Sequence, residues 1–297
     1  MNARIAIALA MLAVPAAHAG EKIKERAAAD PRGEVEVSNL AGTVTVTGWD
    51  RNEVEVTGEL ADDAERLEFV AKRKHTLIKV VFPRDKHSHR RDSDSELNVK
   101  VPERSRVNVS TVSADITVEK VLGAQSLGTV SGDVITTVSE EEVQVRTVSG
   151  DARVSGDGAS TTTQVNTVSG DAIVENLGGE ITAASVSGDI DVTGETADRL
   201  EARSTSGSIR LSVKLADDAR VDADTISGEI ELMLGNARNA EYVIETFSGD
   251  IDNCFGPKPQ RKSQYAPGSE LRFTEGDGDA QVRVNTLSGS VELCDED

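Results

Sequence analysis

The pentapeptide Thr-Val-Ser-Gly-Asp occupies residues 129–133, 147–151 and 167–171. Degenerate copies continue on both sides, and the first eight copies lie 18 to 21 residues apart. The copies are centred on Ser113, Ser131, Ser149, Ser169, Ser187, Ser206, Ser227, Ser248 and Ser288. A period of about 20 residues predicts a solenoid in which each repeat forms one coil that must stack on its neighbours to bury its apolar face.

Each repeat alternates apolar and polar residues, as in Val143, Val145 and Thr147 before one Ser-Gly pair and Ala152 and Val154 after it. Alternation with period 2 indicates strands, so each coil is a strand, a tight turn and a second strand. Stacked coils would pair as parallel sheets about 4.8 Å apart. We therefore expect an all-β fold, a parallel β-helix of about 20-residue coils over 104–297. Val143, Val145, Ala152 and Val154 should point inward, with the Ser-Gly pairs in one line.

The N-terminal third alternates less regularly, in segments such as 34–39, 42–48, 53–58, 76–83 and 96–102. These predict looser coils and a cap over 20–103, with a short helix possible over 62–73. No linker separates the two parts, so we expect one elongated domain over 20–297.

Residues 1–19 have the composition of an export signal. Arg4 precedes the apolar run 5–14, and Ala17-His18-Ala19 fits a small-residue cleavage site. Ten apolar residues are too few to span a bilayer, which needs about 20. We expect a periplasmic or secreted protein cleaved near Ala19, with no transmembrane segment after cleavage.

The chain carries 32 Lys and Arg against 52 Asp and Glu, a net charge of −20. This excess of acid disfavours nucleic acid as a partner. Residues 70–106 run against the trend and contain a candidate anion patch. It consists of Lys72, Arg73, Lys74, Arg84, Lys86, Arg90 and Arg91. A solvated charged loop is the alternative interpretation, and the one we favour.

Three features together resemble a known family. They are NLAGTVTV with GWD at 39–46 and 48–50, LNVKVP at 97–102, and the Thr-Val-Ser-Gly-Asp repeats. This combination resembles DUF4097, a family of exported bacterial β-strand-repeat proteins called putative adhesins. The resemblance implies a right-handed parallel β-helix in the cell envelope. It carries no catalytic residue over to this chain.

Little in the sequence indicates chemistry, and we expect no cofactor and no metal. His87 and His89 supply an incomplete set of metal ligands on a charged loop. The aspartate column Asp115, Asp133, Asp151, Asp171, Asp189 and Asp250 could bind calcium, but capping of the turns is the favoured interpretation. The Thr and Ser column that precedes the turns, from Thr111 to Thr286, is expected to form a structural ladder of hydroxyl groups.

One row of apolar residues breaks the alternation, because strict period 2 places it outside the coil. Its members are Val112, Val130, Val148, Val168, Val186, Ile226, Phe247 and Leu287, with Thr205 in the same row. Nine rungs about 4.8 Å apart would form an apolar ridge about 38 Å long that could bind a partner. The alternative, in which the chain bends at the turn and buries the row, is favoured because monomers rarely expose such patches.

Cys254 and Cys294 each follow the serine of their repeat by six residues, so they occupy the same column. Two coils apart, their Cα atoms would be about 9.6 Å apart, too far for a disulfide; one coil apart, about 4.8 Å would permit it. The Pro- and Gly-rich stretch 255–269 favours an inserted loop and therefore one coil. We predict a Cys254–Cys294 disulfide that clamps this loop and pins the last coil.

The favoured function is an exported, non-enzymatic structural or interaction module of the bacterial cell envelope. It would be adhesin-like and bind a protein or envelope polymer through one face of the solenoid. A periplasmic envelope-stress or assembly accessory protein is the second hypothesis. A polysaccharide-acting β-helix enzyme is the third. Acid pairs are plentiful in this chain and prove little, because glycosidases need two acids at a set separation across a cleft.

Overall fold

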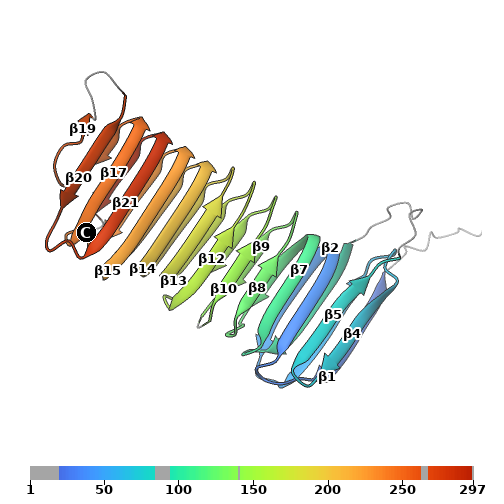
Figure 1. Cartoon of the computed structure of the whole chain (residues 1–297). Helices are drawn as coiled ribbons and strands as arrows, with labels where there is room; N and C mark the ends of the chain where they lie inside the picture. The colour runs from blue at the N-terminus through green and yellow to red at the C-terminus, as the bar shows by residue number, and fades with distance from the viewer. Residues whose placement is uncertain (1–19, 84–93, 140, 262–266, 296–297) are drawn as a thin grey trace, which may run out of the picture.

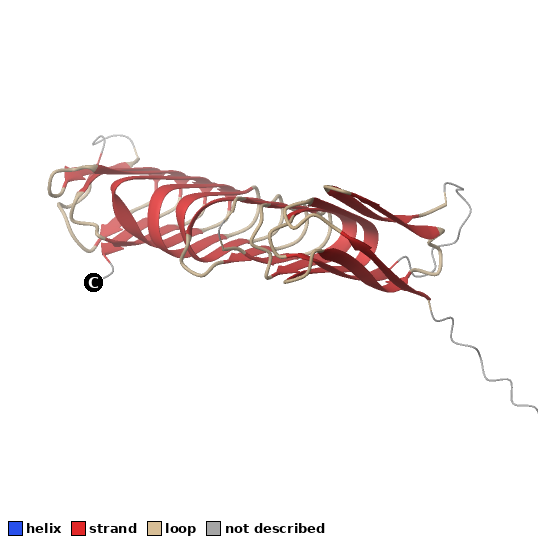
Figure 2. Ribbon diagram, turned by 90° about the horizontal axis from the view of Figure 1, so that it is seen from below, coloured by secondary structure: helices blue, strands red, loops and turns tan. Residues whose placement is uncertain are grey.

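The computed structural model describes residues 20–83, 94–139, 141–261 and 267–295. Every regular element in these ranges is a β-strand. The strands lie side by side in an elongated rack (Figure 1). Seen from below, the rack consists of two layers joined by turns (Figure 2). The predicted export signal, 1–19, lies outside the described residues, and so do Arg84, Lys86, His87, His89, Arg90 and Arg91.

The strands, in chain order, are β1 (Glu21–Ala28), β2 (Glu34–Trp49), β3 (Glu53–Leu60), β4 (Arg66–Lys72), β5 (His75–Val81), β6 (Asp94–Pro102), β7 (Arg106–Glu119), β8 (Gln125–Gly128), β9 (Val134–Thr137), β10 (Val143–Arg146), β11 (Ala152–Ser155), β12 (Ser160–Asn166), β13 (Ala172–Ser185), β14 (Ile190–Ser206), β15 (Ile209–Ser227), β16 (Ile230–Gly235), β17 (Ala240–Ser248), β18 (Ile251–Asn253), β19 (Gln260–Arg261), β20 (Ser269–Thr274), β21 (Ala280–Ser288) and β22 (Val291–Asp295).

Strands of neighbouring coils pair in parallel through the middle of the rack. Strand β10, for example, lies between β8 and β12, and β11 lies between β9 and β13. The inward side chains form continuous columns, and Val143, Val145, Ala152 and Val154 are fully buried as the alternation predicts. Small and β-branched side chains fill this narrow interior, so the chain needs few aromatic residues for its core.

The order of coils in space differs from their order in the sequence at the C-terminal end. Strand β21 pairs with β15 on one side and with β17 on the other (Figure 1). Likewise, β22 lies between β16 and β18. The last coil in the sequence, formed by β21 and β22, is therefore the second from the end in space. The expectation that consecutive repeats always stack on each other is wrong here, because the insertion after β18 lets the chain turn back.

The N-terminal end has the same kind of arrangement. Strand β2 lies between β7 and the strands β5 and β6. Beyond it, β3 pairs antiparallel with β6 and β1, and β4 pairs antiparallel with β5. The short helix considered over 62–73 is wrong, because residues 66–72 form β4. Antiparallel strands thus cover this end of the rack, where a bare parallel edge would invite aggregation.

The inserted stretch 255–269 is not simply a protruding loop. Phe255 is buried and packs against Tyr242 and Phe273, with ring centroids 5.6 and 5.9 Å apart. Tyr242 and Phe273 stack at 4.7 Å, and the Tyr242 hydroxyl donates to the carbonyl of Ala237 at 2.7 Å. Burial raises the pKa of Tyr242. The insertion then continues as β20, which pairs antiparallel with β17 and covers the last edge.

The predicted disulfide between Cys254 and Cys294 is present, with Cα atoms 4.9 Å apart. This separation matches neighbouring rungs, as expected for one coil with an insertion. The bond joins the end of β18 to β22, so it ties the outermost coil to the coil that lies inside it. The bond thus pins the last coil of the sequence, as predicted, although that coil lies one rung inside the end of the rack.

Replacing both cysteines with serine is expected to lower the free energy of unfolding by about 2–4 kcal/mol, because the bond closes a long loop in the unfolded chain. Denaturant unfolding of the C254S/C294S variant against the oxidised protein measures this loss. Reduction of the native protein should reproduce it. Two free thiols in the untreated protein, detected by mass spectrometry, would contradict the bond itself.

Candidate functional site

The row of apolar residues predicted as a possible ridge is exposed. Val112, Val130, Val148, Val168, Val186, Ile226, Phe247 and Leu287 have exposed fractions between 41% and 57%. The favoured alternative, burial by a bend at the turn, is therefore wrong. The strand alternation continues into the turn, so the residue after each buried Thr or Ser points outward. We call this row, with Thr205, the apolar ridge.

The structure adds one member to the ridge that the repeat pattern missed. Asn39 pairs with Thr111 and Ala41 with Ser113, which places Leu40 beside Val112. Leu40 is 39% exposed. Its repeat lacks the Ser-Gly pair, so only alignment of Asn39 with the Thr column could have revealed it. Ten rungs about 4.8 Å apart give a ridge about 43 Å long.

The buried Thr and Ser column holds the turns beneath the ridge. Thr167 donates a hydrogen bond to the carbonyl of Gly170 at 2.7 Å, and Thr246 donates to that of Gly289 at 3.0 Å. These contacts use the hydroxyl groups to satisfy carbonyls that the turn removes from the sheet. The column therefore has the structural role that the sequence predicted, and it fixes the direction in which the ridge side chains point.

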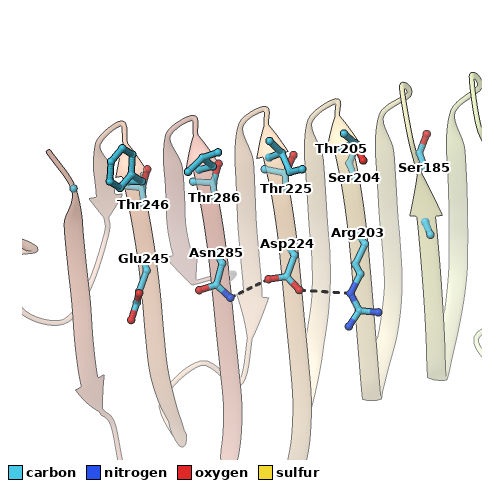
Figure 3. Close-up of a pocket in the computed structure, with 15 residues that line it drawn as sticks. Ser185, Arg203, Ser204, Thr205, Asp224, Thr225, Glu245, Thr246, Asn285 and Thr286 are labelled. Carbon is cyan, nitrogen blue, oxygen red and sulfur yellow. Dashed lines mark hydrogen bonds and ion pairs between the residues drawn. The ribbon is translucent and has the colours of Figure 1, made fainter.

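A groove of about 540 Å³ runs beside the C-terminal half of the ridge. Its lining includes the ridge residues Ile226, Phe247 and Leu287 and, two residues earlier on the same strands, Asp224, Glu245 and Asn285 (Figure 3). Arg203 and Ala184 continue this second row of outward side chains on the next two rungs. Buried Ser and Thr of the column lie between the two rows. The groove is thus apolar on one side and polar on the other, and it crosses five successive rungs.

The second row of the groove lining is held by contacts between neighbouring rungs. Arg203 lies 3.6 Å from the carboxylate of Asp224, and Asn285 donates to Asp224 at 2.9 Å (Figure 3). Arg203 also pairs with Glu201 on its own strand. Such exposed pairs contribute little to stability, but they fix the charges at the groove.

A ladder of aspartates runs parallel to the ridge on the other side of each turn. Asp115 accepts the amide of Asp133 at 3.0 Å, and the same contact repeats at 2.9 Å up to Asp189, which accepts the amide of Ser208 at 2.8 Å. We call Asp115, Asp133, Asp151, Asp171 and Asp189 the acidic ladder. Each carboxylate caps the turn of the next coil, as the favoured interpretation of this column predicts. Asp250 occupies the same column near the outermost turn.

The remaining candidate residues are not brought together with the ridge. Lys72, Arg73 and Lys74 are exposed where β4 turns into β5, at the far end of the rack. His75 lies 3.3 Å from Glu36. Within the described residues, no three His, Cys, Asp or Glu side chains form a group that could hold a metal ion. The described part of the chain contains no helix that is long and apolar enough to cross a membrane.

Fold and site together define a two-layered β-solenoid whose tight-turn edge presents an apolar ridge that Thr205 interrupts. The model of the DUF4097 family, described as Toastrack DUF4097, matches residues 33–234. The chain belongs to the DUF4097 family, as the sequence motifs indicated. Comparison with curated proteins gives no significant match.

Several solved structures are similar over most of their length. A putative adhesin from Parabacteroides distasonis is 12% identical, with 92% of this chain and 97% of that chain covered and a TM-score of 0.42. A protein from the same species described as a putative lipid binding protein is 14% identical, with the same coverage and a TM-score of 0.41. A putative adhesin from Bacteroides fragilis is 12% identical, with 92% and 97% covered and a TM-score of 0.36.

Proposed function

We propose that this protein is an exported, non-enzymatic interaction module of the bacterial cell envelope, adhesin-like in its mode of action. The apolar ridge would contact a protein or polymer partner. The observation that carries the proposal is the ridge itself, nine exposed apolar rungs and Thr205 along one edge, because soluble monomers rarely leave so long an apolar row uncovered. The composition of residues 1–19 supports export to the periplasm or beyond, after cleavage near Ala19.

Three further features belong to this proposal. The coils wind in the right-handed sense. Nucleic acid is not a partner, because a net charge of −20 repels a polyanion. No catalytic residue is assigned, since the proposed role needs only a surface that binds.

The test is retention of the purified protein on envelope preparations from the source bacterium. Phe247→Asp and Val148→Asp each place a charge on the ridge, and we expect each to reduce retention about tenfold or more. Ile135→Asp is the matched control. Ile135 is 49% exposed, on β9 and away from the ridge, so this variant should be retained like the native protein.

Both ridge variants should keep the native circular dichroism spectrum and melting temperature, because the replaced side chains are exposed. If folded ridge variants bind the envelope as well as the native protein does, the ridge is not the binding surface. Retention that falls equally with Ile135→Asp would also count against the proposal, since it would indicate nonspecific apolar contact.

A further inference from the structure

We infer that the partner lying along the ridge is a single segment of another protein that is both apolar and basic. This inference rests on the proposed function, because it specifies what the ridge binds. It depends on three properties of the same edge: its length and width, the sign of the charge beside it, and the change in side-chain size from one end to the other.

The dimensions of the edge suit one linear segment. The ridge is about 43 Å long, and an edge between two sheets about 10 Å apart offers roughly 430 Å². Stable contact between two folded proteins needs about 800 Å² on each partner. About 13 residues of extended chain, or about 29 residues of helix, would cover the same length.

The charge beside the ridge selects a basic partner. The acidic ladder follows the ridge over five consecutive rungs, and its members lie three residues after Val112, Val130, Val148, Val168 and Val186. In each ladder residue, Oδ1 accepts a backbone amide of the next coil. These bonds hold like charges about 4.8 Å apart, where they repel one another. Lysine or arginine side chains along the ladder would relieve that repulsion.

The same charge argues against a second copy as the occupant. Two copies would bring together chains that each carry a net charge of −20. An anionic membrane surface would be repelled for the same reason. A basic segment gains from the charge in two ways, through faster association and through pairing at the ladder.

Side-chain size gives the bound segment a direction. The ridge consists of valines beside the acidic ladder, whereas Ile226, Leu287 and Phe247 line the groove at the C-terminal end. Beyond Asp189 the same column reads Ser208, Glu229, Ser290 and Asp250 in spatial order, so serines separate the acids there. The basic part of the segment would therefore lie along the ladder, and its large apolar side chains would enter the groove.

The experiment measures binding of labelled synthetic peptides to the purified full-length chain by fluorescence anisotropy. The probe is a 14-residue peptide with five Lys-Leu pairs followed by Phe-Leu-Phe-Leu. Its controls carry Glu in place of Lys, or have the same composition in scrambled order. Phosphatidylglycerol vesicles, phosphatidylcholine vesicles and a labelled copy of the chain itself test the other classes of occupant.

We expect the Lys peptide to bind with a Kd of about 10 μM and the Glu peptide to bind at least about tenfold more weakly. Phe247→Asp should weaken binding of the Lys peptide about tenfold. Asp151→Asn and Asp171→Asn each remove a charge while keeping an oxygen for the capping bond. Together they should weaken binding about fivefold and flatten its dependence on salt. Ile135→Ser removes an exposed apolar side chain away from the ridge without changing the charge beside the ladder, so this variant should bind like the native protein.

Equal binding of the Lys and Glu peptides, or of the Lys and scrambled peptides, would overturn the inference. So would tighter binding of either vesicle or of a second copy. If the Lys peptide fails while retention on envelopes still depends on the ridge, the proposed function stands and the basic segment is wrong. If envelope retention is independent of the ridge, the proposed function itself fails.

Discussion

Gly188→Ala is expected to destabilise the protein by about 3 kcal/mol, because a side chain there has no space. A Cβ atom at Gly188 would lie 2.0 Å from the carbonyl oxygen of Gly170 on the preceding coil. A Cβ atom at Gly170 would likewise clash with the carbonyl oxygen of Gly150, and a Cβ atom at Gly207 with that of Gly188. Since each obstacle is backbone in a stacked turn, one coil cannot shift without moving its neighbours.

Gly128→Ala is the matched control, because its Cβ would meet no atom closer than 4.0 Å. That variant should stay within about 0.5 kcal/mol of the native protein. Denaturant unfolding followed by circular dichroism compares the two. Equal stability of Gly188→Ala and Gly128→Ala would show that the turns are not stacked as closely as described.

Removal of residues 275–297 should unfold the cap at the C-terminal end, although β17 and β20 remain in the truncated chain. Strand β17 pairs in parallel with β21 and has no pairing with β15. Without β21 and β22, β17 and β18 lose the coil that joins them to the rest of the rack. We expect amide exchange in 240–274 to accelerate by about 10³-fold, while 143–206 keeps its native protection.

Hydrogen exchange with mass spectrometry measures both regions in one experiment, so the middle of the rack is the internal control. The full-length C254S/C294S variant separates loss of the coil from loss of the disulfide. If β17 keeps native protection after truncation, it can dock directly on β15, and the observed order of coils is not required.

The sequence predicts the middle of this fold well because each repeat there contains the residues that determine its own strands, turn and cap. Val143 and Val145 alternate inward, Gly150 permits close stacking, and Asp151 caps the next turn. The disulfide also followed from the column shared by Cys254 and Cys294. These features depend on position within one repeat or on the spacing of two, and both are visible in the sequence.

The ends of the rack were harder to predict, because their arrangement depends on which coils meet in space. Nothing local to β21 distinguishes a neighbour at β17 from one at β15. Residues 66–72 show mixed spacing and form β4 only because β5 supplies an antiparallel partner. The strand alternation of this chain predicts an exposed ridge, whereas the general tendency of monomers to bury apolar residues predicts a buried one. The structure follows the alternation.

The position of the coil β21–β22 has a consequence for how the protein is made. A ribosome supplies coils in sequence order, and a sequentially stacked solenoid could add each one to a finished end. Here the parallel neighbours of β17 and β18 are β21 and β22, so these two strands reach their native places only after residues 280–295 have been made. The last step of assembly is therefore the insertion of β21 and β22 between strands that precede them in the sequence. In an incompletely synthesised chain that lacks the last coil, the neighbouring strands stay exposed to proteases. A closed C-terminal end of the rack therefore requires a completely synthesised chain.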